Sequence, residues 1–299
     1  MNDGGMIKVL LDTDIGTDID DAICLAYLLR QPRCALLGIT TVTGEAVLRA
    51  QLASAICRKA ERDIPIYPGA ESPLIVPQRQ IHAAQAECLS RWPHATRFPS
   101  GEAVEFLRKT IRENPGEIIL LSVAPLTNIG LLFRVDPEIP HLLRGLVLMA
   151  GRFTDRMAGM IVRTEWNAAG DPHASAIVYG ASCRLHRSVG LDVTTHVTME
   201  GAQFRSSLHG IPVFEPVLDM ADVFLREVPR MTFHDPLAAA TIFEDTLCRY
   251  LRGTVTVDLT PGEGFGETRW SPGKDNALHE VALDVRPDGF FEHFLSVVT

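Results

Sequence analysis

The 299-residue sequence has no long apolar run, few aromatic residues and fewer cations than anions. Its uninterrupted apolar segments fall short of the roughly 18 residues that a membrane-spanning helix needs, so no membrane partner is expected. The chain has 28 Lys and Arg residues against 37 Asp and Glu residues, which gives a formal charge of −9. This excess of negative charge argues against nucleic acid as a partner and favours a small molecule.

Paired cysteines and a secretory leader are also lacking. The six cysteines have neither the CxxC nor the CxxH spacing of a zinc site, and their scatter does not indicate a disulfide scaffold. The first residues have no basic start followed by a small-residue cleavage site. We therefore expect reduced thiols and a cytoplasmic protein.

The apolar residues that are present follow an alternating order of strand and helix periods. Helical spacing, as in residues 20–31 and 47–61, separates the short β-type runs. This order predicts an α/β fold with an open, mainly parallel sheet flanked by helices on both faces. With no credible linker, we expect a single domain over residues 1–299. The β-type runs are residues 7–14, 35–42, 117–125, 143–151 and 183–193.

Two further segments depart from this alternation. Residues 72–100 are rich in proline and weakly periodic, and loops of this length are often lids. The tail from Gly253 onward indicates two or three β-runs joined by Gly and Pro turns.

The stretch DTDIGTDIDD, residues 12–21, places five aspartates directly after the first predicted strand. Sites in parallel sheets form outside the carboxyl ends of strands, and clustered carboxylates disfavour joint ionisation. One or two of these aspartates suit a helix N-cap, which leaves the others unexplained. An EF-hand loop is excluded, because Thr17 and Ile23 stand where it needs Gly and an acid. A divalent cation is favoured, and calcium accepts six to eight oxygen ligands.

A second acidic element and a rival interpretation both depend on distant residues. Asp235 opens an apolar helical run and lies between His234 and Pro236. A phosphatase of the haloacid-dehalogenase type also presents a D-x-D motif after a strand. That interpretation needs a later Ser or Thr, a Lys and an acidic pair. The chain offers Ser122 without a convincing lysine or acidic pair.

With these motifs in view, the chain resembles the calcium-dependent, inosine-uridine-preferring nucleoside hydrolases. Their hallmark D-x-D-P-G-x-D-D-A is matched by a longer loop with two extra residues before the aspartate pair. The segments GITTVTGE, SVAPLTNIGLL, TEWNAAGDPHASAIV and FHDPLAAA follow in the family's order. The resemblance implies a Rossmann-like nucleoside hydrolase fold and metal-dependent hydrolysis of the N-glycosidic bond of ribonucleosides to ribose and free base. It also implies a role in purine or pyrimidine salvage and a homodimer or homotetramer.

The resemblance further implies a role for each matching residue. Asp14 is the implied general base, and His234 is the implied general acid near the leaving base. Trp166 replaces the phenylalanine of the family's EFN motif. Substrate contacts are implied for Glu165, Asn167, His82, Glu45 and Asp20. The implied Ca²⁺ ligands are Asp14, Asp20, Asp21, Asp235 and the backbone carbonyl of Val123.

Departures from the family pattern keep alternatives open. Gly159 and Glu45 stand where the family has asparagine, and the longer loop makes Asp18 an alternative ligand to Asp20. These changes leave room for a nucleoside- or ribose-binding protein that has lost turnover. The sequence does not predict which nucleobase is accepted.

Overall fold

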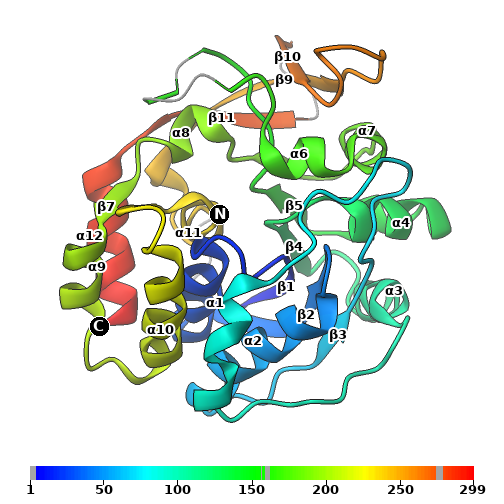
Figure 1. Ribbon diagram of the computed structural model, residues 1–299. Helices are drawn as coiled ribbons and strands as arrows, with labels where there is room; N and C mark the ends of the chain where they lie inside the picture. The colour runs from blue at the N-terminus through cyan, green and yellow to red at the C-terminus, as the bar shows by residue number, and fades with distance from the viewer. Residues whose placement is uncertain (1–4, 156, 159–161, 274–278) are drawn as a thin grey trace.

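The computed structural model describes residues 5–155, 157–158, 162–273 and 279–299. Its centre is a sheet of nine strands (Figure 1). In spatial order, the strands are β10 (Thr268–Pro272), β9 (Cys248–Val257), β11 (His279–Val285), β6 (His186–Ser188), β5 (Gly145–Leu148), β4 (Ile118–Ser122), β1 (Ile7–Thr13), β2 (Cys34–Thr41) and β3 (Ile66–Pro68).

The sheet is mainly parallel, as predicted. Each neighbouring pair from β3 through β11 is parallel, whereas β9 runs antiparallel to both β11 and β10. The predicted tail forms β9, β10 and β11, although β9 begins at Cys248, before Gly253. A separate antiparallel pair consists of β7 (Thr198–Glu200) and β8 (Arg230–Thr232).

Helices cover both faces of the sheet, which confirms the predicted architecture. Because side chains alternate along β1, Val9 and Leu11 join one apolar core and Leu10 joins the other. The first core is covered by α1 (Asp20–Arg30), α2 (Ala46–Lys59), α9 (Gly201–Leu208), α10 (Glu215–Phe224), α11 (His234–Ala240) and α12 (Pro287–Val298). The second is covered by α3 (Ala103–Glu113), α4 (Thr127–Val135), α5 (Ile139–Leu142) and α7 (Pro172–Tyr179).

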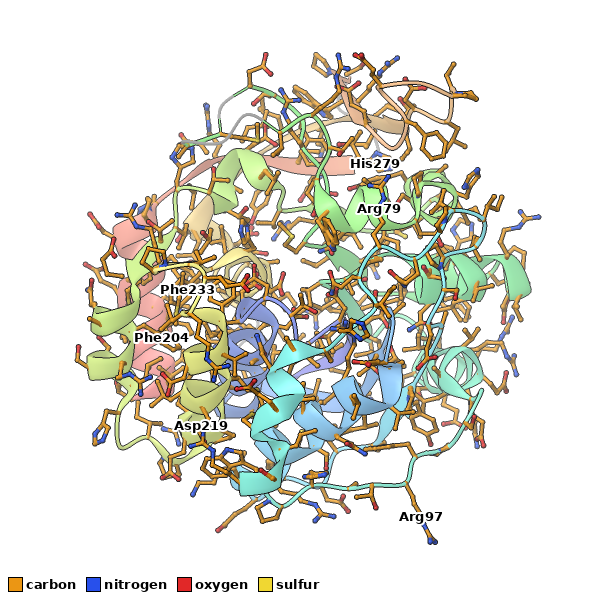
Figure 2. The ribbon with its side chains drawn as sticks, in the orientation of Figure 1. Arg79, Arg97, Phe204, Asp219, Phe233 and His279 are labelled. Carbon is orange, nitrogen blue, oxygen red and sulfur yellow. The ribbon has the colours of Figure 1, made fainter. Side chains whose placement is uncertain are left out.

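Aromatic side chains tie the helices of the first core together. Phe204 of α9 and Phe233, which directly precedes α11, pack edge to face with ring centroids 6.1 Å apart (Figure 2). Phe290 of α12 also packs on Phe233. The start of α11 is thereby fixed against the core. The remaining helical segments are η1 (Ala84–Arg91), α6 (Trp166–Gly170), α8 (Leu191–Thr194), η2 (Pro212–Phe214) and η3 (Asp245–Leu247).

Strand order places the aspartate loop at a topological switch point. The chain leaves β1 for β2 on one side, while β4 lies on the other side of β1. Asp12 pairs in register with Thr40 of β2 and Ser122 of β4, so three carboxyl ends lie together. Ligand sites of open α/β sheets form at such a point. Within the described ranges, none of the helices has the length and apolar character that a bilayer crossing requires.

Candidate active site

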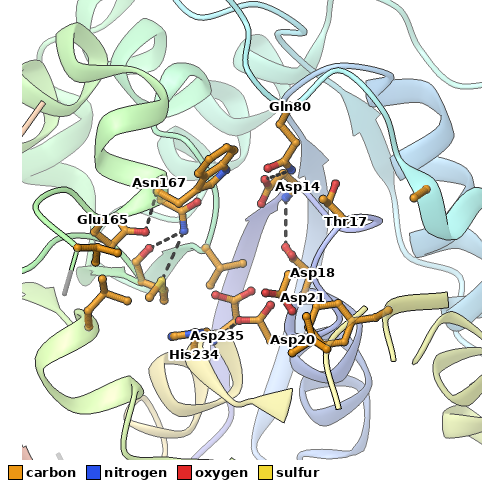
Figure 3. A pocket seen from close by; sticks show the side chains of 18 of the residues that line it. Asp14, Thr17, Asp18, Asp20, Asp21, Gln80, Glu165, Asn167, His234 and Asp235 are labelled. Carbon is orange, nitrogen blue, oxygen red and sulfur yellow. Dashed lines mark hydrogen bonds between the residues drawn. The ribbon is translucent and has the colours of Figure 1, made fainter. Parts of the chain in front are cut away.

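A pocket of about 550 Å³ opens beside the carboxyl ends of β1, β4 and β5 (Figure 3). Its lining combines an acidic group and an apolar group of side chains, the latter with a half-exposed Trp166, and the exposed Glu227 also lines it. The acidic group consists of Asp14, Asp18, Asp20, Asp21, Glu165 and Asp235. The apolar group consists of Val162, Trp166, Val223, Phe224 and Val228.

The aspartate loop folds back so that its two ends meet. Gly16 has a φ of 124°, a conformation that side-chain-bearing residues rarely adopt. The Thr13 hydroxyl and the Asp14 backbone N–H, the latter at 3.2 Å, both donate to Asp21 Oδ1. The carboxylate at the start of α1 is therefore held against the end of β1.

Three buried carboxylates gather at the base of the pocket. Ligand oxygens of Asp20, Asp21 and Asp235 all lie within 4.8 Å of one another. The Asp235 backbone N–H donates to Asp20 Oδ2 at 3.2 Å, across 215 residues of sequence. Burial raises the pKa of all three side chains, and the neighbouring carboxylates raise them further. This oxygen-only donor set suits a divalent cation.

Asp20, and not Asp18, belongs to this carboxylate triad. Asp18 is exposed, and its Oδ1 accepts from the backbone N–H of Ile19 at 2.6 Å. Asp18 still lines the pocket, as does Val123, which follows β4. The geometry therefore favours Asp20 as the ligand in the longer loop.

Asp14 lies beside the triad and is oriented by a residue that the sequence did not reveal. Gln80 Nε2 donates to Asp14 Oδ2 at 2.7 Å (Figure 3). Burial raises the pKa of Asp14 to about 6, while the charge of Arg49 opposes that rise. Gln80 belongs to the irregular segment 72–100, so the only available signal was its place in the expected lid.

Glu165 and Asn167 lie across the pocket from Asp14. Glu165 is the N-cap of α6 and accepts from the backbone N–H groups of Asn167, Ala168 and Gly151. Asn167 Nδ2 donates to the backbone oxygen of Met149 at 2.9 Å. A carboxylate has about four acceptor positions, so Glu165 keeps room for a substrate hydroxyl.

His234 begins α11 next to Asp235 and also lines the pocket. Its Nδ1 shares a hydrogen bond of 2.7 Å with Thr194 Oγ1. Burial lowers the pKa of this imidazole. The ring is therefore mainly neutral at pH 7, and its orientation is fixed by Thr194.

Glu45 and His82 are not among the residues that line the pocket. Glu45 accepts from the Ala83 backbone N–H at 2.8 Å and pairs with His82 Nδ1 at 3.1 Å. The His82 side chain is 77% exposed. Their expected substrate contacts stay predictions, and Gly159 lies outside the described residues.

Asp12 is separated from the pocket by burial. It accepts from Asn128 Nδ2 at 2.8 Å and from the Thr40 hydroxyl, and it is fully buried. Burial raises its pKa to about 7. A D-x-D phosphatase needs the first aspartate within reach of substrate, so this placement disfavours that alternative.

The comparison with known proteins agrees with this geometry. A sequence profile described as "Inosine-uridine preferring nucleoside hydrolase" matches residues 9–292. The pyrimidine-specific ribonucleoside hydrolase RihB of Escherichia coli strain SE11 is 32% identical over 283 residues, which cover 87% of this chain and 86% of RihB. An uncharacterized protein of Schizosaccharomyces pombe is 33% identical over 196 residues, 63% of this chain and 62% of that protein. The chain thus aligns with less than two thirds of the S. pombe protein.

Among solved structures, the purine-preferring ribonucleoside hydrolase of Gardnerella vaginalis has the same fold. Its TM-score is 0.81 at 24% identity, over 97% of this chain and 98% of that protein. At this identity the likeness concerns the fold.

Proposed function

The chain belongs to the inosine-uridine preferring nucleoside hydrolase family, and from this premise we propose that the pocket beside β1 is its catalytic centre. As a family member it is a nucleoside hydrolase, which cleaves the N-glycosidic bond of ribonucleosides. The observation that carries the proposal is the position of Asp14. Its carboxylate faces the same pocket as the Asp20–Asp21–Asp235 triad, Glu165 and Asn167.

We propose Ca²⁺ as the ion of this site. The triad, Asp14 and the backbone carbonyl of Val123 would hold it. These ligands are all oxygens, as a hard cation prefers. When bound, the ion supplies orientation of the ribose hydroxyls and a lower pKa for the attacking water.

Asp14 is proposed as the general base. It accepts a proton as the water oxygen forms a bond to the ribose C1′, and the bond from C1′ to the base nitrogen breaks. Glu165 and Asn167 hold the sugar. Positive charge develops on the ribosyl group in such a transition state, so the surrounding carboxylates favour it electrostatically.

His234 is proposed to assist departure of the nucleobase, which takes the electron pair of the broken bond. When Thr194 donates to Nδ1, the proton of the neutral ring is on Nε2 and is available to a base nitrogen. Val223, Phe224 and Trp166 offer apolar surface for the base. The named relatives differ in base preference, since RihB is pyrimidine-specific and the Gardnerella enzyme is purine-preferring.

The first test is ribose release from a panel of purine, pyrimidine and modified ribonucleosides. We expect release with at least one of them in the presence of Ca²⁺, and loss of release after a chelator is added. Restoring Ca²⁺ to the chelated protein should restore release. A protein that binds Ca²⁺ and ribose without releasing ribose from any substrate would instead support the binding-protein alternative. The oligomeric state, proposed as a homodimer or homotetramer from the family resemblance, is checked by light scattering on the same sample.

Calcium binding should release protons from the site. The pKa of Asp14 is about 6 and the pKa values of the triad are raised, so the metal-free protein holds protons that Ca²⁺ must displace. The affinity for Ca²⁺ should therefore fall as the pH decreases through 7 to 5. Calorimetry in two buffers of different ionisation enthalpy measures this release. Equal apparent enthalpies in the two buffers at pH 6 would contradict it.

A further inference from the structure

Arg49 is the largest fully buried side chain in the described part of the chain. It extends from the first turn of α2 to the aspartate loop, where Nη1 donates to the backbone oxygens of Asp14 and Ile15. Its remaining contacts reach a further residue of the same loop and two other loops. They are Nη1 to Thr17 Oγ1 at 3.1 Å, Nε to the Gly44 backbone oxygen at 2.8 Å and Nη2 to the His82 backbone oxygen at 3.4 Å.

The hydrogen-bond partners of Arg49 are all neutral oxygens. A buried guanidinium normally needs a carboxylate partner, because the transfer of its charge from water is costly. Burial lowers the pKa of Arg49, and the negative charges of Asp14, Asp21 and Glu45 oppose that change from longer range. The same stretch therefore carries the backbone oxygens that Arg49 binds and the Asp20 and Asp21 carboxylates of the triad.

Gln85 completes the support of that loop. Its backbone N–H donates to the Gly16 oxygen at 3.0 Å, and its Nε2 donates to the oxygens of Thr17 and Asp18 at 3.1 and 2.9 Å. Five consecutive carbonyls, from Asp14 to Asp18, are therefore bound by two residues. Of these two, only Arg49 carries charge.

We propose that Arg49 is the positioning residue of the calcium centre. Its planar guanidinium group, through several hydrogen bonds, fixes the backbone of the longer aspartate loop so that Asp14 and Asp21 face the ion. Its charge offsets the repulsion among the carboxylates before the ion binds. This inference rests on the proposed function, because it assigns Arg49 to the same metal site.

The test compares Arg49→Met and Arg49→Lys with the control Arg187→Met. Arg187 is another buried arginine, on β6, where it donates to the Thr241 backbone oxygen at 3.1 Å and to Glu280 at 3.0 Å. Calcium affinity is measured by calorimetry on metal-free protein, and thermal unfolding is followed with and without Ca²⁺. kcat and KM are then measured at saturating Ca²⁺.

Arg49→Met is expected to weaken calcium binding by about 10- to 100-fold, the range seen when groups that orient metal ligands are removed. Arg49→Lys keeps the positive charge but loses the guanidinium group and its several donors. Its calcium affinity should therefore lie between those of Arg49→Met and the wild type. Arg187→Met should lower the unfolding temperature and leave calcium affinity unchanged. When Ca²⁺ is raised to saturation, kcat of Arg49→Met should rise toward the wild-type value. The factor by which kcat rises should be larger than the factor by which KM changes.

The inference is overturned if Arg49→Met binds calcium with wild-type affinity. It is also overturned if the affinity of Arg49→Met falls no more than that of Arg187→Met. If Arg49→Met does not fold, wild-type affinity in Arg49→Lys overturns it instead. Both results leave the proposed function standing. A wild-type protein that binds no Ca²⁺ overturns the proposed metal site itself and, with it, the role of Arg49.

Discussion

Replacing Asp14 with asparagine is expected to lower kcat for ribonucleoside hydrolysis by about 10³-fold, within the range that a general base contributes. The change keeps the size of the side chain and its capacity to accept from Gln80 Nε2, and it removes the group that accepts the water proton. Ribose release at saturating Ca²⁺ measures kcat directly. Saturation matters because Asp14 is also a proposed ligand, so the variant needs more Ca²⁺ than the wild type.

The pH profile gives a second readout of the same substitution. A general base acts when deprotonated, so wild-type kcat should fall as the pH decreases below the pKa of Asp14 in the complex. The residual activity of Asp14→Asn should lack this acidic limb. The control is Asp18→Asn, which removes an exposed carboxylate from the same loop. A wild-type-like rate in Asp14→Asn would rule out Asp14 as the base. An equal loss of kcat in Asp18→Asn would show that the total negative charge of the loop, and not a base at Asp14, sets the rate.

Replacing Asp235 with asparagine should have opposite effects on the metal-free and calcium-bound proteins. In the metal-free protein, three buried carboxylates lie within 4.8 Å, so removing one relieves repulsion and raises the unfolding temperature. The raised pKa of Asp235 means that the stability associated with its protonation is present at low pH and is lost as the pH rises through the folded-state pKa. The stabilisation by Asp235→Asn should therefore be larger at pH 8 than at pH 5.

The same variant should lose stabilisation by calcium. Ca²⁺ at 100 times its wild-type Kd should stabilise the wild type by about 2.7 kcal/mol. Calcium affinity in Asp235→Asn should fall by about 100-fold or more, because affinity depends on the number of charged ligands. At the same Ca²⁺ concentration the variant should therefore show little shift in unfolding temperature.

Asp171→Asn is a matched control for Asp235→Asn. Asp171 is a buried N-cap of α7 that accepts from the Ala174 and Leu74 backbone N–H groups. Its replacement should lower stability equally with and without Ca²⁺. A calcium-dependent shift of wild-type size in Asp235→Asn would contradict the assignment of Asp235 as a ligand.

Local patterns were sufficient to predict the mainly parallel sheet, the helices on both of its faces and the acidic loop, whereas the short strands β3, β7 and β8 were not predicted. Strands of a parallel sheet that is covered on both faces are apolar along their whole length, so β1, β2, β4, β5 and β6 were each visible as short apolar runs. The helices were visible because their buried residues recur with a period of 3.6. The aspartate loop was visible because a site at a strand end needs several carboxylates in a short segment. These features depend on neighbours in sequence.

The tertiary structure alone decided which polar residues meet at the loop. Gln80, Gln85 and Arg49 act through contacts with distant segments, which no local period encodes. Asp12 and Asp14 are two residues apart, and the pleat alone would place them on the same face. Asp12 lies inside β1 and is fully buried, whereas Asp14 follows the end of β1 at Thr13 and lines the pocket. The sequence by itself determined the fold class and the acidic chemistry, because these depend on composition and short-range pattern. It also determined the family, through the resemblance of several motifs that follow in the family's order. The packing of separate loops decided that Asp20 joins the triad, that Glu45 pairs with His82 outside the pocket lining, and that a buried arginine supports the loop.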